Sequence, residues 1–433
     1  MPKLKIEKLV EGGQGIGYSS NPVYTGRAFF VWEALPGEEL EAEIVNKRKG
    51  IYESRAVNIL KPSPHRTVSP EDHFLSCSPW QIMDFEYENE QKTAIAIESY
   101  QRIAKLTEED IKILDIKILS DNQQFGYRNK MEFSFIEEGD RKISLAFFER
   151  GKKKRIAING CELAMPAINT TAKIVLEWIN KSGLTERNLK SLIIRSNQKG
   201  ETIAGLFIKD KINFKEYPEI NDTFLGFNLY YSTYKSPASV ITEVLYQEGQ
   251  DFLIEEIAGK KFKYGINSFF QVNISVFEKA LEEIKNSIPN LSNVVDFYSG
   301  VGTIGLSLTK NAKSVILVES NEEAVSFAEE NIKSNSIVEA HCHAPTSAEK
   351  ALDLIKNDKI LIFDPPRAGL NQKIVDRILE VKPSKIVYLS CNVATQARDI
   401  GLLKDVYNIE FIKLYNFFPR TPHIESLCIL EKK

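Results

Sequence analysis

Cysteine is scarce in this sequence, which has five copies in 433 residues, scattered far apart. An odd number of widely spaced cysteines is not typical of a disulfide framework, so we expect free thiols. Long apolar runs are also missing: none approaches the roughly 18 residues that a membrane-spanning helix needs, and Met1 to Lys5 lead into no signal-peptide core. We therefore expect a cytoplasmic protein with no membrane partner.

Charge of one sign does not dominate, because 56 lysines and arginines stand against 59 aspartates and glutamates, for a net charge of -3. This balance excludes a globally basic nucleic-acid-binding protein, although it permits a local basic face. Hydrophobic residues make up 43% and charged residues 27%, as in ordinary globular proteins. A chain of this length predicts two or three domains.

Residues 1–61 alternate short strand-like runs with glycine and proline turns. Several short strands at this spacing predict a small β-barrel. The basic tip at residues 46–50 suits contact with a phosphate backbone, but a plain solvated turn explains it equally well. Lys61-Pro62 and Ser63-Pro64 mark the end of this domain.

Residues 62–285 show a mixed pattern, which predicts a central α+β domain that presents the substrate. Helices are expected at residues 85–105 and 167–180. The basic run at 150–155 reads as a hairpin, which is either a solvated turn or a second contact for phosphate. The expected strands cover residues 131–135, 191–194 and 202–207.

From residue 286 to residue 433, apolar β-branched runs alternate regularly with helix-length segments. Strands separated by helices predict a parallel sheet, and the short link before the last strand predicts an antiparallel hairpin. Seven strands closed by a hairpin form a doubly wound, Rossmann-like α/β fold of the methyltransferase kind. The expected strands cover residues 294–297, 314–319, 339–343, 360–363, 385–390, 410–414 and 424–430.

A glycine turn follows the first of these strands, with Gly300 and Gly302 after Asp296. Glycines at a helix start let the backbone approach a ligand closely, and dinucleotide binding is the usual rival interpretation. The acidic Asp296 before the turn and Glu319 at the end of the next strand favour S-adenosylmethionine, because Glu319 would lie where ribose hydroxyls bind. A solvated carboxylate is the alternative for Glu319.

Three chemically active side chains are predicted to meet at one edge of this sheet. Cys391 ends the strand at 385–390, and Asp364 ends the strand at 360–363, held by two following prolines. If the last two strands form a hairpin, Glu425 starts the seventh strand at the same edge. The alternatives are a buried structural cysteine and a structural turn at Asp364.

A thiol, a carboxylate and a methyl donor together suit methylation of carbon 5 of uracil. A thiolate that adds to carbon 6 pushes electron density onto carbon 5, which can then take a methyl group. The proton on carbon 5 must leave afterwards, and this step needs a base. Cys391 fits the nucleophile and Glu425 the base, with His423 as a rival base.

These residues belong to a set of motifs that covers essentially the whole chain. By these motifs the chain resembles the RNA uracil-5-methyltransferases with an N-terminal TRAM domain, the group that contains bacterial 23S rRNA uridine methyltransferases. The motifs are the barrel at the start, Tyr127-Arg128-Asn129-Lys130, Phe269-Phe270-Gln271-Val272-Asn273, the Gly300 turn, Asp364-Pro365-Pro366-Arg367, Ser390-Cys391-Asn392 and His423-Ile424-Glu425.

The resemblance implies a role for each matched position. Cys391 matches the nucleophile and Glu425 the base. The barrel would be an OB-type TRAM domain that contributes to RNA binding, and the protein would be a monomer. The RNA would be 23S rRNA, with the T-loop of tRNA as the alternative and a non-catalytic RNA-binding protein as a second alternative. The implied cofactor contacts are Gln271, Tyr298, Thr303 (at a position that is often asparagine), Glu319 and Asp364.

Two departures from the family pattern stand out. Many members hold a four-iron, four-sulfur cluster through three cysteines near the first domain boundary and a fourth further on. Here Cys77 is the single cysteine left of the three and Cys161 matches the fourth, so the sequence predicts neither this cluster nor another metal site. Packing around Trp80 is a candidate replacement. The segment Ser347-Ala348-Glu349 also differs from the family pattern, which puts the adenine contact in doubt.

Overall fold

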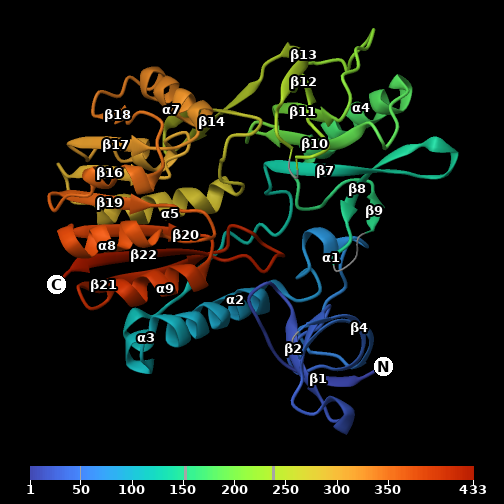
Figure 1. Cartoon of the computed structure of the whole chain (residues 1–433), viewed down its shortest axis with the longest axis horizontal. Helices are drawn as coiled ribbons and strands as arrows, with labels where there is room; N and C mark the ends of the chain where they lie inside the picture. The colour runs from blue at the N-terminus through green and yellow to red at the C-terminus, as the bar shows by residue number, and fades with distance from the viewer. Residues whose placement is uncertain (49, 151–153, 237–238) are drawn as a thin grey trace.

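The computed structural model describes residues 1–48, 50–150, 154–236 and 239–433 (Figure 1). Lys49 of the first basic tip and Lys152 and Lys153 of the second basic run lie outside these residues. Among the described residues, no helix combines the length and the apolar character that crossing a membrane requires.

The N-terminal strands close into a barrel, as the sequence predicts, and the strand order in the structure is β1-β2-β3-β5-β4. Alternate residues of β1 point inward, so that Leu4 and Ile6 join Phe29, Val31 and Leu40 in a small core. Its elements are β1 (Lys3–Leu9), β2 (Gly15–Ser19), the short helix η1 (Pro22–Tyr24), β3 (Ala28–Trp32), β4 (Glu39–Arg48) and β5 (Ile51–Lys61).

A second sheet, of seven strands within the described residues, has the order β13-β12-β11-β10-β7-β8-β9. Helix α4 (Pro166–Ser182) begins at a proline, ends at Gly183 and packs on this sheet through Ile168, Val175 and Ile179. The other elements are β7 (Lys130–Glu137), η3 (Gly139–Arg141), β8 (Ile143–Phe148), β9 (Arg155–Ile158), β10 (Leu189–Ser196), β11 (Thr202–Ile208), β12 (Phe224–Tyr231) and β13 (Glu243–Gly249).

The C-terminal sheet has the order β18-β17-β16-β19-β20-β22-β21-β6. The first five strands are parallel, and β22 lies antiparallel between β20 and β21, which confirms the predicted closing hairpin. The strands are β16 (Asn293–Phe297), β17 (Ser314–Val318), β18 (Ala340–Cys342), β19 (Lys359–Phe363), β20 (Lys385–Ser390), β21 (Tyr407–Tyr415), β22 (Glu425–Lys432) and β6 (Ile118–Leu119).

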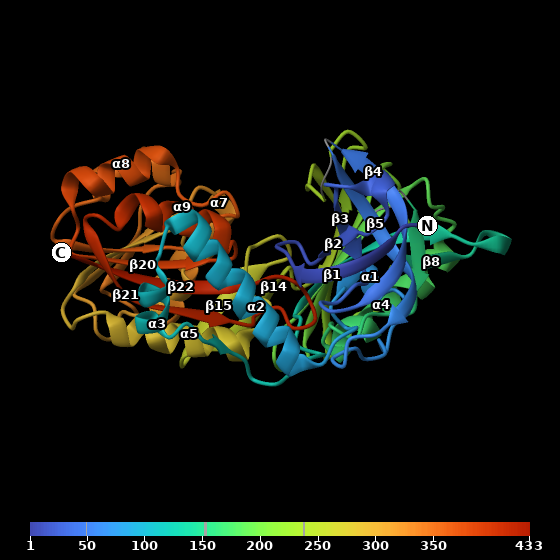
Figure 2. The same ribbon diagram turned by 90° about the horizontal axis from the view of Figure 1, so that it is seen from below.

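Both faces of this sheet are buried, because alternate residues of its strands enter two different cores. Val387 and Leu389 of β20 pack on the side of α5, whereas Ile386 and Tyr388 pack on the side of α8 and α9 (Figure 2). The helical elements are α5 (Ile274–Ser287), α6 (Thr303–Ser307), α7 (Glu322–Ser334), η4 (Ala348–Lys350), η5 (Leu352–Leu354), α8 (Gln372–Val381) and α9 (Val393–Leu403).

Segments from both ends of residues 62–285 also pack on the C-terminal sheet. Helix α2 (Phe85–Ser99) continues as a π-helical turn, η2 (Tyr100–Ala104), and contacts α9. The strand β6, which the sequence pattern does not reveal, extends this sheet by pairing with β21. The remaining elements are α1 (Phe74–Cys77), α3 (Glu108–Leu114), β14 (Phe252–Ile257) and β15 (Lys260–Gly265).

Candidate active site

The carboxyl edge of the C-terminal sheet brings together the thiol and the carboxylates that the sequence singles out. Cys391 follows the last residue of β20, and Asn392 then caps α9 by accepting a hydrogen bond from the Thr395 amide at 3.1 Å. Because Ser426 of β22 pairs with Ser390 of β20, Glu425 lies at the same edge. The topology therefore joins residues that are far apart in the sequence.

Cys391 opens into a cleft of about 330 Å³. The cleft is bounded by Gly12 of the barrel, Ile95 of α2, and by Arg367 and His423 of the C-terminal domain. Burial and the charges of Glu425 and Asp364 together raise the pKa of Cys391 to about 12, against the opposing charge of Arg367. In the free protein the thiol is therefore protonated.

Two carboxyl groups lie close to this thiol, Glu425 buried and Asp364 half-buried. Burial raises the pKa of both Asp364 and Glu425, and the charge of Asp364 raises that of Glu425 further. The Gln271 amide lies 3.4 Å from Asp364 Oδ2. Glu425 Oε1 has no hydrogen-bond partner among the described residues, so it is available to a ligand.

The glycine turn after β16 lies next to these carboxylates. Tyr298, Gly300 and Gly302 all have positive φ angles, of 62°, 54° and 90°. A Cβ at Gly302 would lie 3.0 Å from the side chains of two leucines, so the helix that follows packs tightly at this glycine. Thr303 is the first residue of α6.

Two acidic residues hold the shape of the turn. Glu319 accepts hydrogen bonds from the amides of Gly300, Ser320 and Asn321, at 3.0, 2.6 and 2.8 Å. Asp296 is buried and accepts one from the Gly305 amide at 2.8 Å. Burial raises the pKa of Asp296 to about 8, and the charges of Asp364 and Glu319 act in the same direction.

The turn fits S-adenosylmethionine. The buried hydroxyl of Ser299 has no hydrogen-bond partner among the described residues, and the nearest atom to a Cβ at Gly300 would be a carbonyl oxygen 3.9 Å away. The backbone is thus open to a ligand, and Glu319 lies at the strand end where a ribose is bound in such folds. Burial raises the pKa of Tyr298, and the charge of Glu349 raises it further, so this carboxylate of the segment 347–349 lies near the turn.

His423 is a weak base in this setting. Burial lowers its pKa to about 3, and the charge of Arg367 lowers it as well. Its two ring nitrogens lie 3.2 and 3.3 Å from Arg367 Nη2. A proton on His423 would therefore face a fixed positive charge, which favours Glu425 over His423 as the proton acceptor.

Sequence reasoning missed the buried ionic network that supports the loop before Glu425. Lys92 donates to Glu88 at 2.8 Å, to Asn416 Oδ1 at 2.6 Å and to the Phe418 carbonyl at 3.0 Å. Glu88 in turn accepts from the amide of Arg420. A Glu–Lys pair four residues apart on a helix is typical of a solvated face, yet both side chains are fully buried here.

The segment that carries Gln271 has supports of its own. The side-chain amide of Asn129 donates to the backbone carbonyl of Gln271 at 2.9 Å, and Arg195 Nε donates to the backbone carbonyl of Ile266 at 2.8 Å. The motif at residues 127–130 points to Asn129 in the sequence but does not reveal this contact. Arg195 lies in a strand-like run, and nothing in the surrounding sequence marks it as a support for the site.

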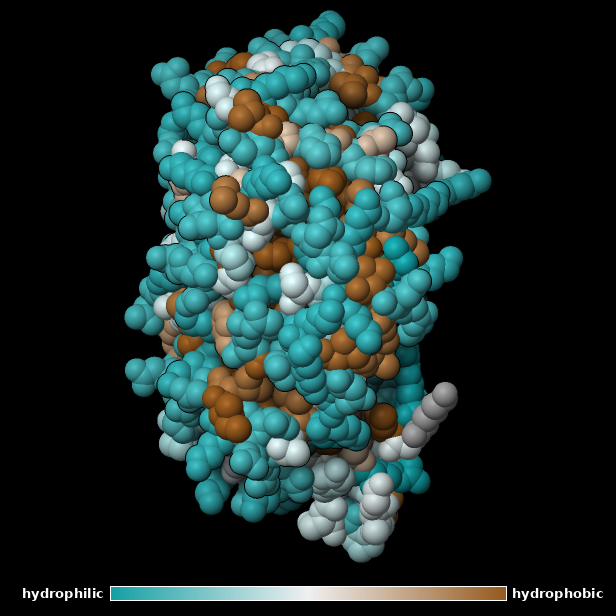
Figure 3. Space-filling view, turned by 90° about the vertical axis from the view of Figure 1, so that its left-hand side faces the viewer, coloured by the Kyte–Doolittle hydropathy of each residue, from teal (hydrophilic) through white to brown (hydrophobic). Residues whose placement is uncertain are grey.

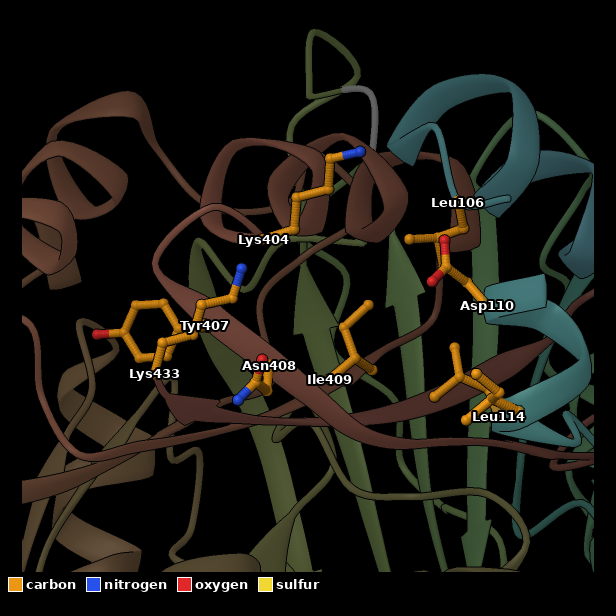
Figure 4. Close-up of a pocket in the computed structure, with 9 residues that line it drawn as sticks. Leu106, Asp110, Leu114, Lys404, Tyr407, Asn408, Ile409 and Lys433 are labelled. Atoms are coloured by element: carbon orange, nitrogen blue, oxygen red, sulfur yellow. The ribbon is translucent and has the colours of Figure 1, made fainter. Parts of the chain in front are cut away.

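A separate hollow of about 420 Å³ lies at the opposite edge of the C-terminal sheet (Figure 4). It is bounded by Leu106, Asp110, Lys404 and Tyr407, and contains none of the predicted site residues. The surrounding end of the molecule is mainly hydrophilic, with scattered apolar side chains (Figure 3).

The strand order, the closing hairpin and the glycine turn define the C-terminal domain as a Rossmann-like methyltransferase of the S-adenosylmethionine-dependent class. The family model of the tRNA (uracil-5-)-methyltransferases matches residues 92–433. The chain belongs to this family, and its activity class is RNA uracil-5-methylation.

Relatives and solved structures extend the likeness over the whole chain. An uncharacterized RNA methyltransferase of Fusobacterium nucleatum is 30% identical, over 100% of this chain and 96% of the relative. One of Caldanaerobacter subterraneus is 29% identical, over 99% and 98%. The crystal structure of Pyrococcus abyssi tRNA (uracil-54, C5)-methyltransferase in complex with S-adenosyl-L-homocysteine has a TM-score of 0.76 and 25% identity, over 99% of this chain and 100% of that one.

Proposed function

We propose that this protein methylates carbon 5 of a uridine in RNA through a transient covalent bond between Cys391 and carbon 6 of the base. The observation that carries the proposal is the meeting of Cys391 with Glu425, whose Oε1 is unpartnered among the described residues, at one edge of the sheet. Because the glycine turn lies beside them, methyl donor and acceptor would share one site.

The steps follow from the positions of the two residues. Cys391 first loses its proton to water in the cleft and then adds to carbon 6 as a thiolate, which the charge of Arg367 and the N-terminus of α9 favour. The electron pair of the double bond moves to carbon 5, which forms a bond to the incoming methyl group. Glu425 then takes the proton from carbon 5, the double bond forms again and the Cys391 thiolate leaves.

The cofactor contacts in this proposal are Gln271, Tyr298, Thr303, Glu319 and Asp364. S-adenosylmethionine, when bound, supplies the methyl group. Glu319 would hold the ribose, and the ligand could approach the backbone at Gly300 closely because no side chain fills the space there. Asp364, which Gln271 contacts, would orient the donor towards the edge that carries Cys391.

The barrel and α2 offer a path for the RNA. A groove of about 590 Å³ between them is bounded by Lys8, Tyr18, Phe30 and Arg102, and it shares Ile95 with the Cys391 cleft. Lys8 and Arg102, which both pair with Glu98 of the same groove, would contact phosphates, and the aromatic rings would stack with bases, as binding of single-stranded RNA needs. A flipped uridine would pass from this groove to the thiol.

The proposed division of labour is RNA binding by residues 1–61, RNA presentation by residues 62–285 and catalysis by residues 286–433. The protein would act in the cytoplasm as a monomer. In this proposal 23S rRNA is the substrate, on the likeness to 23S rRNA enzymes that carry a TRAM domain. The T-loop of tRNA is the second candidate, since the Pyrococcus abyssi tRNA enzyme matches the chain over its full length, barrel included.

Methylated uridines in a strain that lacks the gene would separate the two substrates. We expect one 5-methyluridine to disappear from 23S rRNA while tRNA keeps its own. Loss from the tRNA T-loop alone would replace the rRNA proposal by the tRNA one and would leave the chemistry untouched.

RNA that contains 5-fluorouridine tests the adduct. Fluorine cannot leave carbon 5 as a cation, so we expect a covalent complex that survives denaturing electrophoresis. Cys391→Ala should form none, and Cys342→Ser, which alters a thiol on β18, should form as much as the wild type. A complex that persists in Cys391→Ala would reject the mechanism. The absence of both complex and methylation in the wild type would favour a non-catalytic RNA-binding protein.

A further inference from the structure

Four side chains that the catalytic site does not use meet where the barrel and the central sheet approach each other. Glu71, His73 and Cys77 come from the segment around α1, and Cys161 follows β9 (Figure 1). The group is largely shielded from solvent: the side chains of His73 and Glu71 are 11% and 7% exposed, and Cys161 is 2% exposed. Imidazole, carboxylate and two thiols are the main protein ligands of transition metals.

Three of the donor atoms have a spacing close to that of a tetrahedral metal site. Cys77 Sγ lies 3.5 Å from His73 Nδ1 and 3.8 Å from Glu71 Oε2. One donor atom from each of these three residues lies within 4.8 Å of the others. For Zn–S of about 2.3 Å and Zn–N or Zn–O of about 2.0–2.1 Å, tetrahedral angles separate the ligand atoms by about 3.6 Å. The thiol of Cys161 lies close enough to that of Cys77 to interact with it, outside the group of three, and would complete the set as a fourth donor when a metal binds.

Outer contacts fix the donors in the orientation that a metal needs. His73 Nε2 lies 3.0 Å from the Gly160 carbonyl, so the proton resides on Nε2 and the lone pair of Nδ1 faces Cys77. The Gln81 amide donates to Glu71 Oε2 at 2.6 Å, and the Glu162 backbone amide donates to Oε1 at 2.7 Å. Metal sites in proteins are normally held by such hydrogen bonds to their ligands.

The charge around the group points to a cation. Within the part of the chain that the structure describes, Glu71 has no ion pair with lysine or arginine, and its Oε1 lies 3.2 Å from His73 Nε2. Arg150 is close enough to act on Cys77, but its Nε donates to the Leu75 carbonyl and its guanidinium lies over the Trp32 ring. Buried anionic groups are normally paired with a cation or bound to a metal.

We propose that Glu71, His73, Cys77 and Cys161 bind one Zn²⁺ ion. Two thiolates with an imidazole exclude magnesium and calcium, which prefer oxygen ligands, and a set of four closed donors is typical of a structural zinc site. The ion would tie the segment around α1 to residues 160–162 of the central domain. The proposal replaces the prediction from the sequence that the protein has no metal site. It is independent of the proposed catalytic mechanism.

The site has a route to the catalytic edge. Trp80 is buried beyond Cys77 in the same segment, its backbone amide donates to the Arg420 carbonyl at 3.1 Å, and its indole donates to the Gly13 carbonyl of the barrel at 3.1 Å. Zinc binding would therefore stabilise the docking of three parts of the molecule without touching the reacting groups.

Metal analysis of the full-length protein tests the proposal. The wild type, purified without chelator, should hold one zinc per chain and no acid-labile sulfide. Cys77→Ser and Cys161→Ser should each lose that zinc, whereas the control Cys342→Ser should keep it. Gln81→Leu, which removes the hydrogen bond to Glu71, should weaken zinc binding by about 10- to 100-fold.

A second measurement covers variants that fold poorly. Wild-type protein freed of metal by a chelator should show a lower Tm, and added Zn²⁺ should restore the Tm, while Mg²⁺ should not. Cobalt should give a thiolate-to-metal absorption band in the wild type. The proposal would be overturned if added Zn²⁺ did not change the Tm of the metal-free protein, or if Cys77→Ser retained its zinc. It would also be overturned if the protein held about four irons with sulfide per chain.

Discussion

Two thiols of this chain lie in opposite surroundings. Cys391 opens into a cleft and faces two carboxyl groups, and burial and these charges raise its pKa to about 12. Cys77 faces an imidazole and a second thiol in a closed cluster, and its hydrogen bonds with Cys161 and His73 hold its pKa below that of an ordinary thiol. A thiol that bonds transiently must be reachable and lie beside a base, whereas a permanent ligand must lie among other donors.

Removal of each thiol should therefore have a different consequence. We expect Cys391→Ala to lower RNA methylation by at least about 10⁴-fold, a size seen when a nucleophile is lost from covalent catalysis. Its Tm and zinc content should stay at the wild-type values. Single-turnover assays with tritiated methyl donor, run beside thermal unfolding, check both parts. Cys77→Ser should show the reverse pattern, and a variant that lost both properties at once would break the distinction.

Glu425 sharpens the catalytic half of the comparison. In Glu425→Gln the methyl group could still be transferred under the proposed mechanism, but the proposed base that completes the reaction would be missing. We expect turnover to fall by about 10²- to 10⁴-fold, as is common for loss of a general base. A covalent complex should accumulate on ordinary uridine RNA, which denaturing electrophoresis detects. If Glu425→Gln released product at the wild-type rate, another group would have to be the base.

The buried network of Lys92 lies between the two thiol regions. Lys92→Met leaves Glu88 buried without its lysine, and we expect the free energy of unfolding to fall by about 3–5 kcal/mol. Arg377→Met breaks an exposed ion pair with Glu380 and serves as the control, with a change within about 0.5 kcal/mol. Urea unfolding measures both. Arg420 Nη1 also pairs with Glu88, at 3.3 Å, so a double variant, Glu88→Gln with Lys92→Met, would leave a buried guanidinium without its carboxylate and should not recover the loss.

The pH dependence of stability gives the smallest expected effect. Burial raises the pKa of Glu425 in the folded protein, so its stabilising contribution is complete below the unfolded pKa and is lost as pH rises through the folded pKa. Glu425→Gln lacks this loss. We expect its Tm to exceed that of the wild type increasingly between pH 5 and pH 8.5, as differential scanning fluorimetry would record. Parallel curves would show that Glu425 has an ordinary pKa.

The sequence predicted the C-terminal domain in detail because its signals are local. Strands buried on both faces are continuous apolar runs such as 385–390, helices separate them, and Gly300 marks the turn. The short final link then placed Glu425 at the edge of Cys391, a position that the strand pairing confirms.

The remaining features depend on contacts between distant segments. Glu88 and Lys92 have the spacing of a solvated ion pair, and only the packing of α2 on the loop at 416–420 makes them a buried network. Likewise, Glu71 and Cys161 are 90 residues apart, so no local pattern joins them with His73 and Cys77. The sequence by itself determined the catalytic sheet and the residues at its edge. Tertiary structure alone decided which charges are buried and which donors meet, because burial and distance are properties of the packed chain.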